Sequence, residues 1–300
     1  MTDTSVLAQV SDGLAAAVET AAASTVLVSG RRRIPASGIA WSAGGVVLTA
    51  DHVIERDEVD VVLPDGSKHR AAVAGRDAGS DVAVLQVEAA LTAAVRAPEG
   101  SARVGSLVLA VGRPSGEGPM ASLGVIGAVG GPWRTFRGTE VEGYLRSDTT
   151  FYPGFSGGPL IDAQGRVVGM NSSRLGRGAG LTIPVAALER IANDLLAGGK
   201  VRRAYLGISS QVARLPAALS ALAGGRETGL LVVAVETGSP ADAAGMLMGD
   251  ILIELGGKPV ADTDSLQAEL GPSRIGQSTT ATVLRGGESK ALAITIGERA

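Results

Sequence analysis

The sequence contains no cysteine, which excludes disulfide bonds and thiolate metal sites and leaves the redox compartment open. Aromatic residues make up only 3% of the 300 residues, so small and branched aliphatic side chains must supply most of the packing. A formal net charge of −3 argues against a nucleic-acid-binding protein. Neither a Walker-type nor a dinucleotide-type glycine pattern occurs, and no cofactor is expected.

Long apolar runs are also missing, so no membrane span is expected. Glu19 interrupts the one alanine-rich run near the start of the chain, and no other segment is long enough to cross a bilayer. The first residues lack the basic start of a secretory signal. The chain as given is therefore expected to be cytoplasmic, or periplasmic or otherwise extracytoplasmic if the sequence has been trimmed.

Histidine is scarce too, because the chain contains only His52 and His69. Two histidines without cysteine are better explained by catalysis than by metal binding, and no metal site is expected. His52 ends an apolar run, Gly-Val-Val-Leu-Thr-Ala-Asp-His-Val, where a scaffold can present a side chain at a strand exit. His69 follows a polar hairpin-like segment and is expected to be a solvated surface residue.

One glycine-rich and proline-rich stretch stands out, the segment from Phe151 to Leu160, which reads Phe-Tyr-Pro-Gly-Phe-Ser-Gly-Gly-Pro-Leu. Ser156 lies among glycines, which permit backbone conformations that other residues avoid and let a substrate approach closely. A serine on such a turn can present its hydroxyl to a carbonyl group. The alternative is an ordinary β-turn with a solvent-facing serine.

The order of the residues along the chain separates two plans for a serine hydrolase. Both histidines precede Ser156, which excludes the α/β-hydrolase order of serine, acid and histidine. The order histidine, aspartate, serine remains. Asp81 is the preferred acid, because it directly precedes a buried-looking strand, whereas its competitor Asp77 lies in a turn-like Arg-Asp-Ala-Gly segment.

Three blocks carry a resemblance to a known family: Leu48–Val53, Ser80–Leu85 and Pro153–Leu160. In this order they are similar to the catalytic blocks of the HtrA/Deg family of trypsin-like serine endopeptidases, which carry C-terminal PDZ domains. The resemblance covers the chain from about Val26 to its end. It implies hydrolysis of peptide bonds in unfolded or misfolded proteins.

The resemblance also implies a role for each matching residue. His52 would be the general base, Asp81 its orienting acid and Ser156 the nucleophile, with the backbone N–H groups of Gly154 and Ser156 forming the oxyanion hole. The family usually has asparagine before the serine, where this chain has Phe155. The alternative is therefore a catalytically silent peptide-binding or chaperone-like protein with a collapsed oxyanion loop.

The predicted fold is mostly β, a chymotrypsin-like double β-barrel followed by one α+β PDZ domain. Apolar residues at helical spacing from Val6 to Ala22 predict an N-terminal helix, and residues 1–22 are assigned to it. Short strands punctuated by glycine indicate an all-β barrel or sandwich. The resemblance assigns residues 23–198 to the protease domain and 199–300 to the PDZ domain. The segments 112–120 and 130–138 are expected to be surface loops or, by the resemblance, mobile loops beside the active site. A homo-oligomer is left open, and a trimer is undecided because no aromatic residue precedes Trp41.

The C-terminal part resembles a PDZ domain that binds peptide C-termini. The residues expected to line its peptide groove are Tyr205, Leu206, Gly207 and Ile208 in the carboxylate-binding loop, and Leu266 and Leu270 on a helix from Asp264 to Leu270. Such a loop offers backbone N–H groups to a terminal carboxylate, while the next strand pairs with the peptide.

Thr150 and Phe151 are the predicted residues of the primary specificity pocket, because they lie just ahead of the nucleophile. A neutral pocket narrowed by Phe151 is expected to accept small or medium aliphatic residues before the cut. Asp148 is the nearest acid upstream. Two roles are open for it: its carboxylate lines the pocket, or it makes a structural hydrogen bond.

Overall fold

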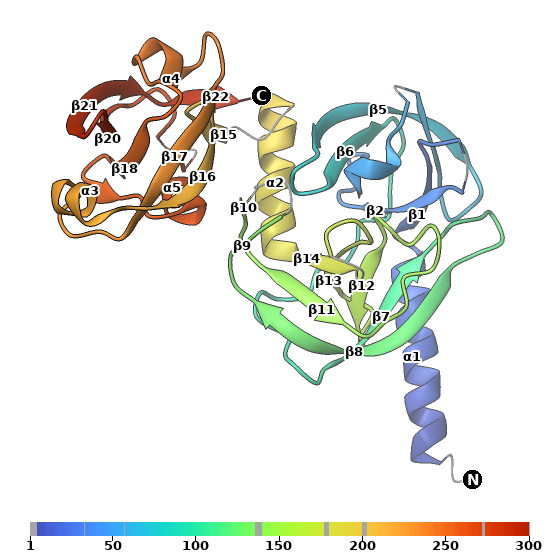
Figure 1. The fold of residues 1–300 in the computed structure, drawn as a ribbon. Helices are drawn as coiled ribbons and strands as arrows, with labels where there is room; N and C mark the ends of the chain where they lie inside the picture. Colours follow the sequence, from blue (N-terminus) through green and yellow to red (C-terminus); the bar gives the residue numbers. More distant parts are fainter. Residues whose placement is uncertain are drawn as a thin grey trace. The chain divides into compact units, whose positions relative to one another are not determined.

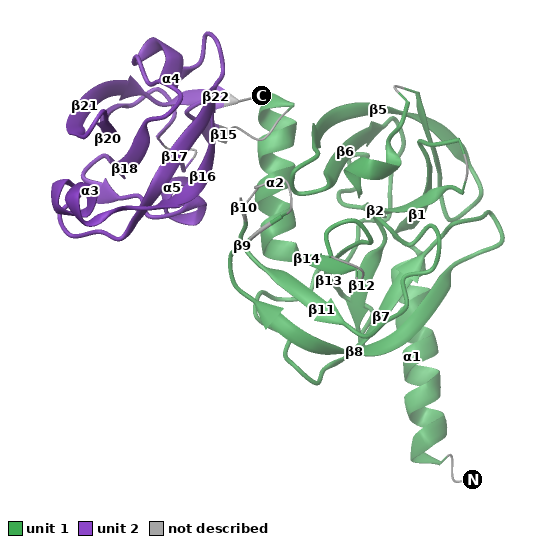
Figure 2. Ribbon diagram, in the orientation of Figure 1, with its two compact units in different colours: residues 1–201 green, residues 202–300 purple. Residues whose placement is uncertain are grey.

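The chain forms two compact units, Met1–Val201 and Arg202–Ala300, shown in different colours in Figure 2. The computed structural model describes residues 5–32, 34–56, 58–135, 140–176, 180–199, 203–271 and 274–299 (Figure 1). Each unit buries hydrophobic clusters made of its own residues, so each has a core of its own.

The first barrel is a closed sheet of six strands in the order β1-β2-β3-β6-β5-β4. Its strands are β1 (Thr25–Ser29), β2 (Ala36–Ala40), β3 (Val46–Thr49), β4 (Val59–Val62), β5 (Lys68–Asp77) and β6 (Val82–Val87). Valine is frequent in β1, β3, β4 and β6, and its branched side chain suits a pleated, buried surface. Closure of the sheet leaves no long unpaired edge.

The second barrel is also closed, with six strands in the order β11-β14-β13-β12-β7-β8. These strands are β7 (Leu107–Gly112), β8 (Met120–Gly130), β11 (Tyr144–Ser147), β12 (Pro159–Asp162), β13 (Val167–Ser172) and β14 (Leu181–Pro184). Two short strands, β9 (Trp133–Arg134) and β10 (Glu140–Val141), pair with each other. Within the segment 130–138 that was expected to be a loop, residue 130 ends β8 and residues 133 and 134 form β9, while residues 136–138 lie outside the described residues.

Two helices pack on the barrels (Figure 1). The helix α1 (Val6–Ala22) begins at the cap residue Ser5, whose hydroxyl accepts a hydrogen bond from the Ala8 N–H at 3.2 Å. The helix α2 (Val185–Gly198) contacts β5 and β6 of the first barrel and β13 and β14 of the second. Leu195 of α2 is fully buried in a cluster with residues of both barrels. The barrels are therefore held together by a shared core.

The second unit is built on a sheet in the order β16-β17-β18-β20-β21, with β19 paired to β18. The strands are β15 (Arg203–Tyr205), β16 (Ile208–Arg214), β17 (Thr228–Val235), β18 (Ile251–Leu255), β19 (Lys258–Pro259), β20 (Ser278–Arg285), β21 (Glu288–Thr295) and β22 (Gly297–Arg299). Three short helices complete it: α3 (Ala217–Leu222), α4 (Pro240–Ala243) and α5 (Thr263–Ala268). The strand β16 lies at one end of the sheet order, so one of its edges is open to pairing.

The predicted double barrel is confirmed, and the helix over Val6–Ala22 has the predicted bounds. The predicted start of the groove helix at Asp264 is wrong. Asp262 is the cap, because its carboxylate accepts the Ser265 N–H at 2.8 Å while Ser265 Oγ accepts the Asp262 N–H at 3.0 Å. The helix α5 ends at Ala268, so Leu270 lies just beyond it.

Candidate active site and peptide groove

His52 lies on a single 3₁₀ turn, Asp51–Val53, shortly after β3. The Asp51 carboxylate accepts a hydrogen bond from Arg76 Nε at 2.7 Å. Arg76 Nη2 also donates to the main-chain carbonyls of Asp51 at 3.2 Å and Ile54 at 2.8 Å. The backbone that presents the imidazole is therefore braced on both sides by one arginine of β5.

Asp81 is held directly beside His52. Its carboxylate is buried, and its Oδ2 and Oδ1 atoms lie 2.8 and 3.0 Å from His52 Nδ1. The His52 main-chain N–H donates to Oδ1 at 3.0 Å, and Ser172 Oγ of the second barrel donates to Oδ2 at 2.5 Å. When the Nδ1–H donates to this carboxylate, the Nε2 atom is left free to accept a proton.

The backbone of Asp81 has a positive φ of 59°, the one such value among the described non-glycine residues. A left-handed conformation costs on the order of 1–3 kcal/mol for a residue with a side chain and often occurs at functional sites. The preceding turn is fixed by the buried Asp77, whose carboxylate accepts the N–H groups of Gly79 and Ser80, each at 3.1 Å. Asp77 therefore supports the turn that delivers Asp81.

His69 lies on β5, and its Nε2 atom is 3.0 Å from Ser67 Oγ. It is partly buried, whereas a solvated surface position was expected. The strand β4 pairs with β5 at this point, with Val61 opposite His69.

Ser156 is 6% exposed and lies in the loop before β12. Its hydroxyl oxygen is 2.9 Å from Ser173 Oγ and accepts the Ser173 N–H at 3.3 Å. Across the described parts of the chain, no hydrogen bond joins Ser156 Oγ to His52. The nucleophile predicted from the sequence thus has Ser173 as its immediate partner in this conformation.

The loop ahead of Ser156 is a tight turn. The Phe155 N–H donates to the Tyr152 carbonyl at 3.0 Å, and Gly154 has a φ of 92°, which together indicate a type II turn with proline second and glycine third. The Phe155 side chain is fully buried in the core of the second barrel and meets Tyr152 edge-on, with ring centroids 5.4 Å apart. A Cβ atom on Gly112 would lie 2.6 Å from the Phe155 ring, so glycine there makes room for it.

The same loop lies against the backbone of the first barrel. A Cβ atom on Gly157 would lie 2.2 Å from the Ser37 carbonyl oxygen and 2.4 Å from Thr49 Oγ1. Ser37 Oγ donates a hydrogen bond to the Gly154 carbonyl at 2.7 Å. The backbone at Gly157 lies closer to Ser37 and Thr49 than any side chain at position 157 would allow, which explains why the serine is followed by glycine.

The two predicted pocket residues differ in burial. Thr150 is exposed, whereas Phe151 is half-buried and its ring lies where a Cβ atom on Gly180 would come within 2.2 Å. Asp148 is exposed, and its Oδ1 atom accepts the Val125 N–H at 2.6 Å. That bond connects the end of β11 to β8.

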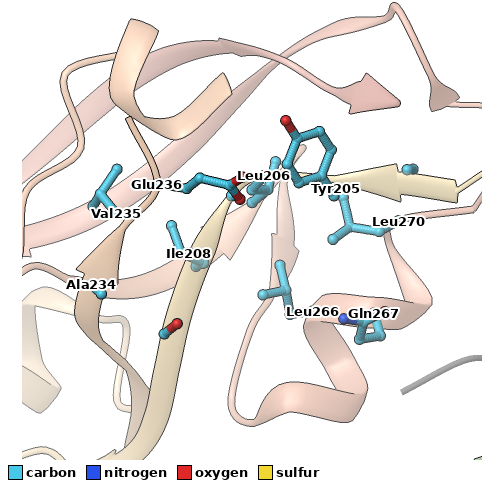
Figure 3. Close-up of a pocket in the computed structure, with 12 residues that line it drawn as sticks. Tyr205, Leu206, Ile208, Ala234, Val235, Glu236, Leu266, Gln267 and Leu270 are labelled. Carbon is cyan, nitrogen blue, oxygen red and sulfur yellow. The ribbon is translucent and has the colours of Figure 1, made fainter. Parts of the chain in front are cut away.

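All six predicted groove residues line a single cavity of about 240 Å³ in the second unit (Figure 3). Leu206, Leu266 and Leu270 are at most 9% exposed and form its apolar floor. Gly207 has a φ of 82°, and a Cβ atom there would lie 2.1 Å from Ser239 Cβ. The loop therefore requires glycine, and its close packing against Ser239 fixes the backbone ahead of the open strand β16.

Several site residues were not found from the sequence. Glu236 and Gln267 also line the groove, and Figure 3 shows the Glu236 side chain near Leu206. The pairing of Ile208 with Val235 places Glu236 beside the loop, but that register is not visible in the sequence. Ser37, Ser172 and Ser173 were missed for the same reason, because their contacts depend on distant segments.

Within the described ranges, no cluster of three or more histidine, aspartate or glutamate side chains could hold a metal ion. None of the helices in these ranges is long and apolar enough to cross a membrane.

Two family descriptions match the chain. Residues 36–170 match the trypsin-like peptidase domain, and residues 204–296 match the PDZ domain. A probable periplasmic serine endoprotease DegP-like of Ectopseudomonas mendocina (strain ymp) is 35% identical over 268 residues, which are 87% of this chain and 56% of that protein. A putative serine protease HhoB of Synechocystis sp. (strain ATCC 27184 / PCC 6803 / Kazusa) is 33% identical over 284 residues, 87% of this chain and 66% of that protein. The chain thus spans little more than half of the first of these relatives.

Solved structures of serine proteases also match this chain, over nearly its whole length. The HtrA-type protease AlgW with tripeptide is 30% identical with a TM-score of 0.73, and the match covers 96% of this chain and 97% of that one. The serine endoprotease from Yersinia pestis is 29% identical with a TM-score of 0.76, and the match covers 95% of this chain and 97% of that one.

Proposed function

The chain belongs to the HtrA-type family of trypsin-like serine proteases with a PDZ domain, and we propose that it is a serine endopeptidase acting through His52, Asp81 and Ser156. The observation that carries the proposal is the bond between His52 Nδ1 and the Asp81 carboxylate, at 2.8 Å, with Ser172 Oγ as a further donor to the same carboxylate. This arrangement holds the imidazole with Nε2 available as a base.

The reaction is acyl transfer from the scissile peptide to Ser156 and then to water. His52 Nε2 takes the proton of Ser156 Oγ as that oxygen bonds to the peptide carbonyl carbon, and then gives the proton to the leaving amine as the C–N bond breaks. In the second half, His52 takes a proton from water, whose oxygen attacks the ester carbon, and returns the proton to Ser156 Oγ as the bond between Oγ and the acyl carbon breaks. Asp81 stays ionised and stabilises the imidazolium in both halves.

The first step requires Ser156 to change its hydrogen-bond partner. Its hydroxyl is 2.9 Å from Ser173 Oγ, so it must exchange this partner for His52 Nε2 before attack. One neutral hydrogen bond contributes about 1 kcal/mol net, so the loss of this contact is a small part of an enzymatic barrier.

The proposed oxyanion hole consists of the N–H groups of Gly154 and Ser156. The type II turn at Tyr152–Phe155 supports it, because a positive φ at Gly154 is the backbone choice that separates this turn from a type I turn. The burial of Phe155 in the core of the second barrel supports a serine loop that accommodates an aromatic residue beside Ser156.

We place the primary specificity pocket at Thr150 and Phe151. Phe151 is uncharged and contacts the backbone at Gly180. The Asp148 carboxylate is exposed and accepts the Val125 N–H, so it does not supply a buried free carboxylate for a basic side chain. A lysine would then be buried without a partner, at a cost of several kcal/mol. Small and medium aliphatic residues are therefore the proposed choice before the cut.

The groove of the second unit is proposed to bind peptide C-termini. An extended peptide would add to the open edge of β16, its last side chain on the leucine floor and its carboxylate at the backbone of Leu206–Ile208. Unfolded proteins are the proposed substrates, because extended chains fit both a protease cleft and this edge.

The names of the periplasmic relatives support a location outside the cytoplasm. The proposed domain limits are 1–22, 23–198 and 199–300.

Degradation of unfolded casein tests the proposal. Wild-type protein is expected to cleave it, and Ser156→Ala or His52→Ala is expected to lower the rate by about 10⁴ or more, because members of a triad act as a unit. His69→Ala is the matched histidine control and should retain activity. Mass spectrometry of the fragments should place the cuts after valine, alanine or isoleucine; cuts mainly after lysine and arginine would refute the proposed pocket.

The alternative function is a catalytically silent peptide-binding or chaperone-like protein. The observation in its favour is the contact of Ser156 with Ser173 in place of His52. Casein that stays intact with wild-type protein, together with tight binding of casein, would support this alternative.

A further inference from the structure

Ser37 of β2 holds the main-chain oxygens of both Gly154 and Ser156. Its hydroxyl donates to the Gly154 carbonyl at 2.7 Å, and its own N–H donates to the Ser156 carbonyl at 3.2 Å. Ser37 is fully buried, and it belongs to the first barrel while both acceptors belong to the second. One residue of the opposite barrel therefore contacts both residues whose N–H groups are proposed to bind the oxyanion.

The direction of the Ser37 hydroxyl is set by a second bond. Ser37 Oγ accepts the Arg113 N–H at 2.8 Å, so its single proton is free to be given to the Gly154 carbonyl. The Arg113 guanidinium in turn donates to the carbonyls of Thr25 at 2.9 Å and Ala22 at 3.2 Å. Burial lowers the pKa of this guanidinium. Each of these hydrogen bonds therefore has a fixed donor and a fixed acceptor, and the Ser37 hydroxyl proton is directed at the Gly154 carbonyl.

The Gly154 carbonyl belongs to the peptide that joins Gly154 to Phe155, so a hydrogen bond to it restrains the backbone on the carboxyl side of the proposed oxyanion donor Gly154. Gly154 has no Cβ atom and can take backbone angles on either side of φ zero, so its own chemistry does not fix the turn. The first barrel leaves no room for a larger residue, because a Cβ atom on Gly154 would lie 2.7 Å from the Pro35 carbonyl oxygen. Gly154 therefore allows the serine loop to lie close to Pro35, and it also needs a hydrogen-bond partner outside the loop to hold its backbone conformation.

We propose that Ser37 is a positioning residue that sets the oxyanion hole, by tying the Gly154 and Ser156 carbonyls of one barrel to β2 of the other. The proposal rests on the proposed function, because it assumes that Gly154 and Ser156 supply the oxyanion donors. Ser37 does not touch the substrate. It acts through the backbone of the loop.

Ser37→Ala removes the bond to Gly154 and keeps the bond from the Ser37 N–H. Removing an oxyanion donor costs about 10²–10³ in kcat, so a residue that only positions the donor is expected to cost about tenfold in kcat with KM little changed. A peptide boronic acid, whose tetrahedral adduct needs the hole, should bind about tenfold more weakly for the same reason. The rate of fluorophosphonate labelling should fall, while the final extent stays at that of wild type.

Ser24→Ala is the matched control, because it removes another buried serine-to-carbonyl bond, Ser24 Oγ to the Ala21 carbonyl at 3.1 Å, away from the loop. It is expected to leave kcat and boronate affinity unchanged. Ser37→Cys keeps a weak donor of similar size and should fall between alanine and wild type in kcat, which provides a test if Ser37→Ala does not fold.

The proposal is overturned if Ser37→Ala loses no more kcat than Ser24→Ala, or if boronate affinity stays at the wild-type value. A Ser37→Cys variant with full wild-type kcat and a folded Ser37→Ala with the same kcat would also overturn it. Failure of the proposed function gives a different result, since wild-type protein itself would then take up no fluorophosphonate.

Discussion

Ser156 and His52 differ in how firmly their side chains are held. The His52 ring is fixed through Nδ1 by a buried carboxylate that also accepts a hydrogen bond from Ser172 of the other barrel. The Ser156 hydroxyl instead contacts Ser173. The proposed base is thus oriented in advance, whereas the proposed nucleophile would have to leave one partner for another.

Ser173→Ala is expected to raise reactivity. The substitution removes the hydroxyl that competes with His52 for Ser156, and a bond of about 1 kcal/mol corresponds to a gain of roughly twofold to fivefold in the reactive orientation. The rate of acylation by a peptide ester measures this, with Ser24→Ala as the control for loss of a serine hydroxyl. A fall of tenfold or more would mean that Ser173 assists the reaction.

At the scale of elements, the loop Tyr205–Ile208 and the edge strand β16 make the proposed peptide groove. The backbone of Gly207 is left-handed, and its missing side chain is what allows contact with Ser239. The N–H groups that would receive a carboxylate belong to this stretch of backbone. Their positions therefore depend on a glycine that cannot be enlarged.

Gly207→Ala is expected to weaken binding of peptides with an apolar C-terminus by about tenfold or more, because the new Cβ atom displaces the loop that receives the carboxylate. Gly225→Ala is the matched control: Gly225 has a φ of 84°, but a Cβ atom there meets nothing within 4 Å. Fluorescence anisotropy of a labelled peptide, in acid and amide forms, measures both variants. Equal binding of acid and amide by wild-type protein would contradict the carboxylate loop.

The elements that the sequence predicted well are those specified by neighbouring residues. The helix Val6–Ala22 follows from apolar spacing, and the serine loop follows from its glycines and prolines. The cap of α5 was missed because Asp262 and Asp264 both suit a helix start, and the choice depends on the Ser265 hydroxyl. Ser37 was missed for another reason: it lies 117 residues from its partner Gly154, and no local pattern encodes that contact.

At the scale of the whole molecule, the first unit depends on contact between its barrels. The proposed base and acid come from one barrel and the proposed nucleophile from the other, so their geometry requires that the barrels do not move apart. The helix α2 contributes to this by packing on strands of both. Leu195 is its most buried leucine, together with Leu188.

Leu195→Ala is expected to destabilise both barrels together. Truncating a buried leucine costs about 2–5 kcal/mol, and the loss should appear as one transition because the cluster is shared. Leu196→Ala is the matched control on the same helix, since Leu196 is 46% exposed. Urea unfolding followed by the fluorescence of Trp41 and Trp133 compares the two variants. Equal shifts for both variants, or two separate transitions, would contradict the shared core.

The central claim is that Ser156 is a nucleophile activated by His52, and covalent labelling with a fluorophosphonate tests it most directly. Intact-mass and peptide mass spectrometry should find one adduct per wild-type chain, located on Ser156. Labelling should be absent in Ser156→Ala and slowed by about 10³ or more in His52→Ala, because the serine then lacks its base. The claim is contradicted if wild-type protein takes up no label, or if Ser156→Ala is labelled at the wild-type rate.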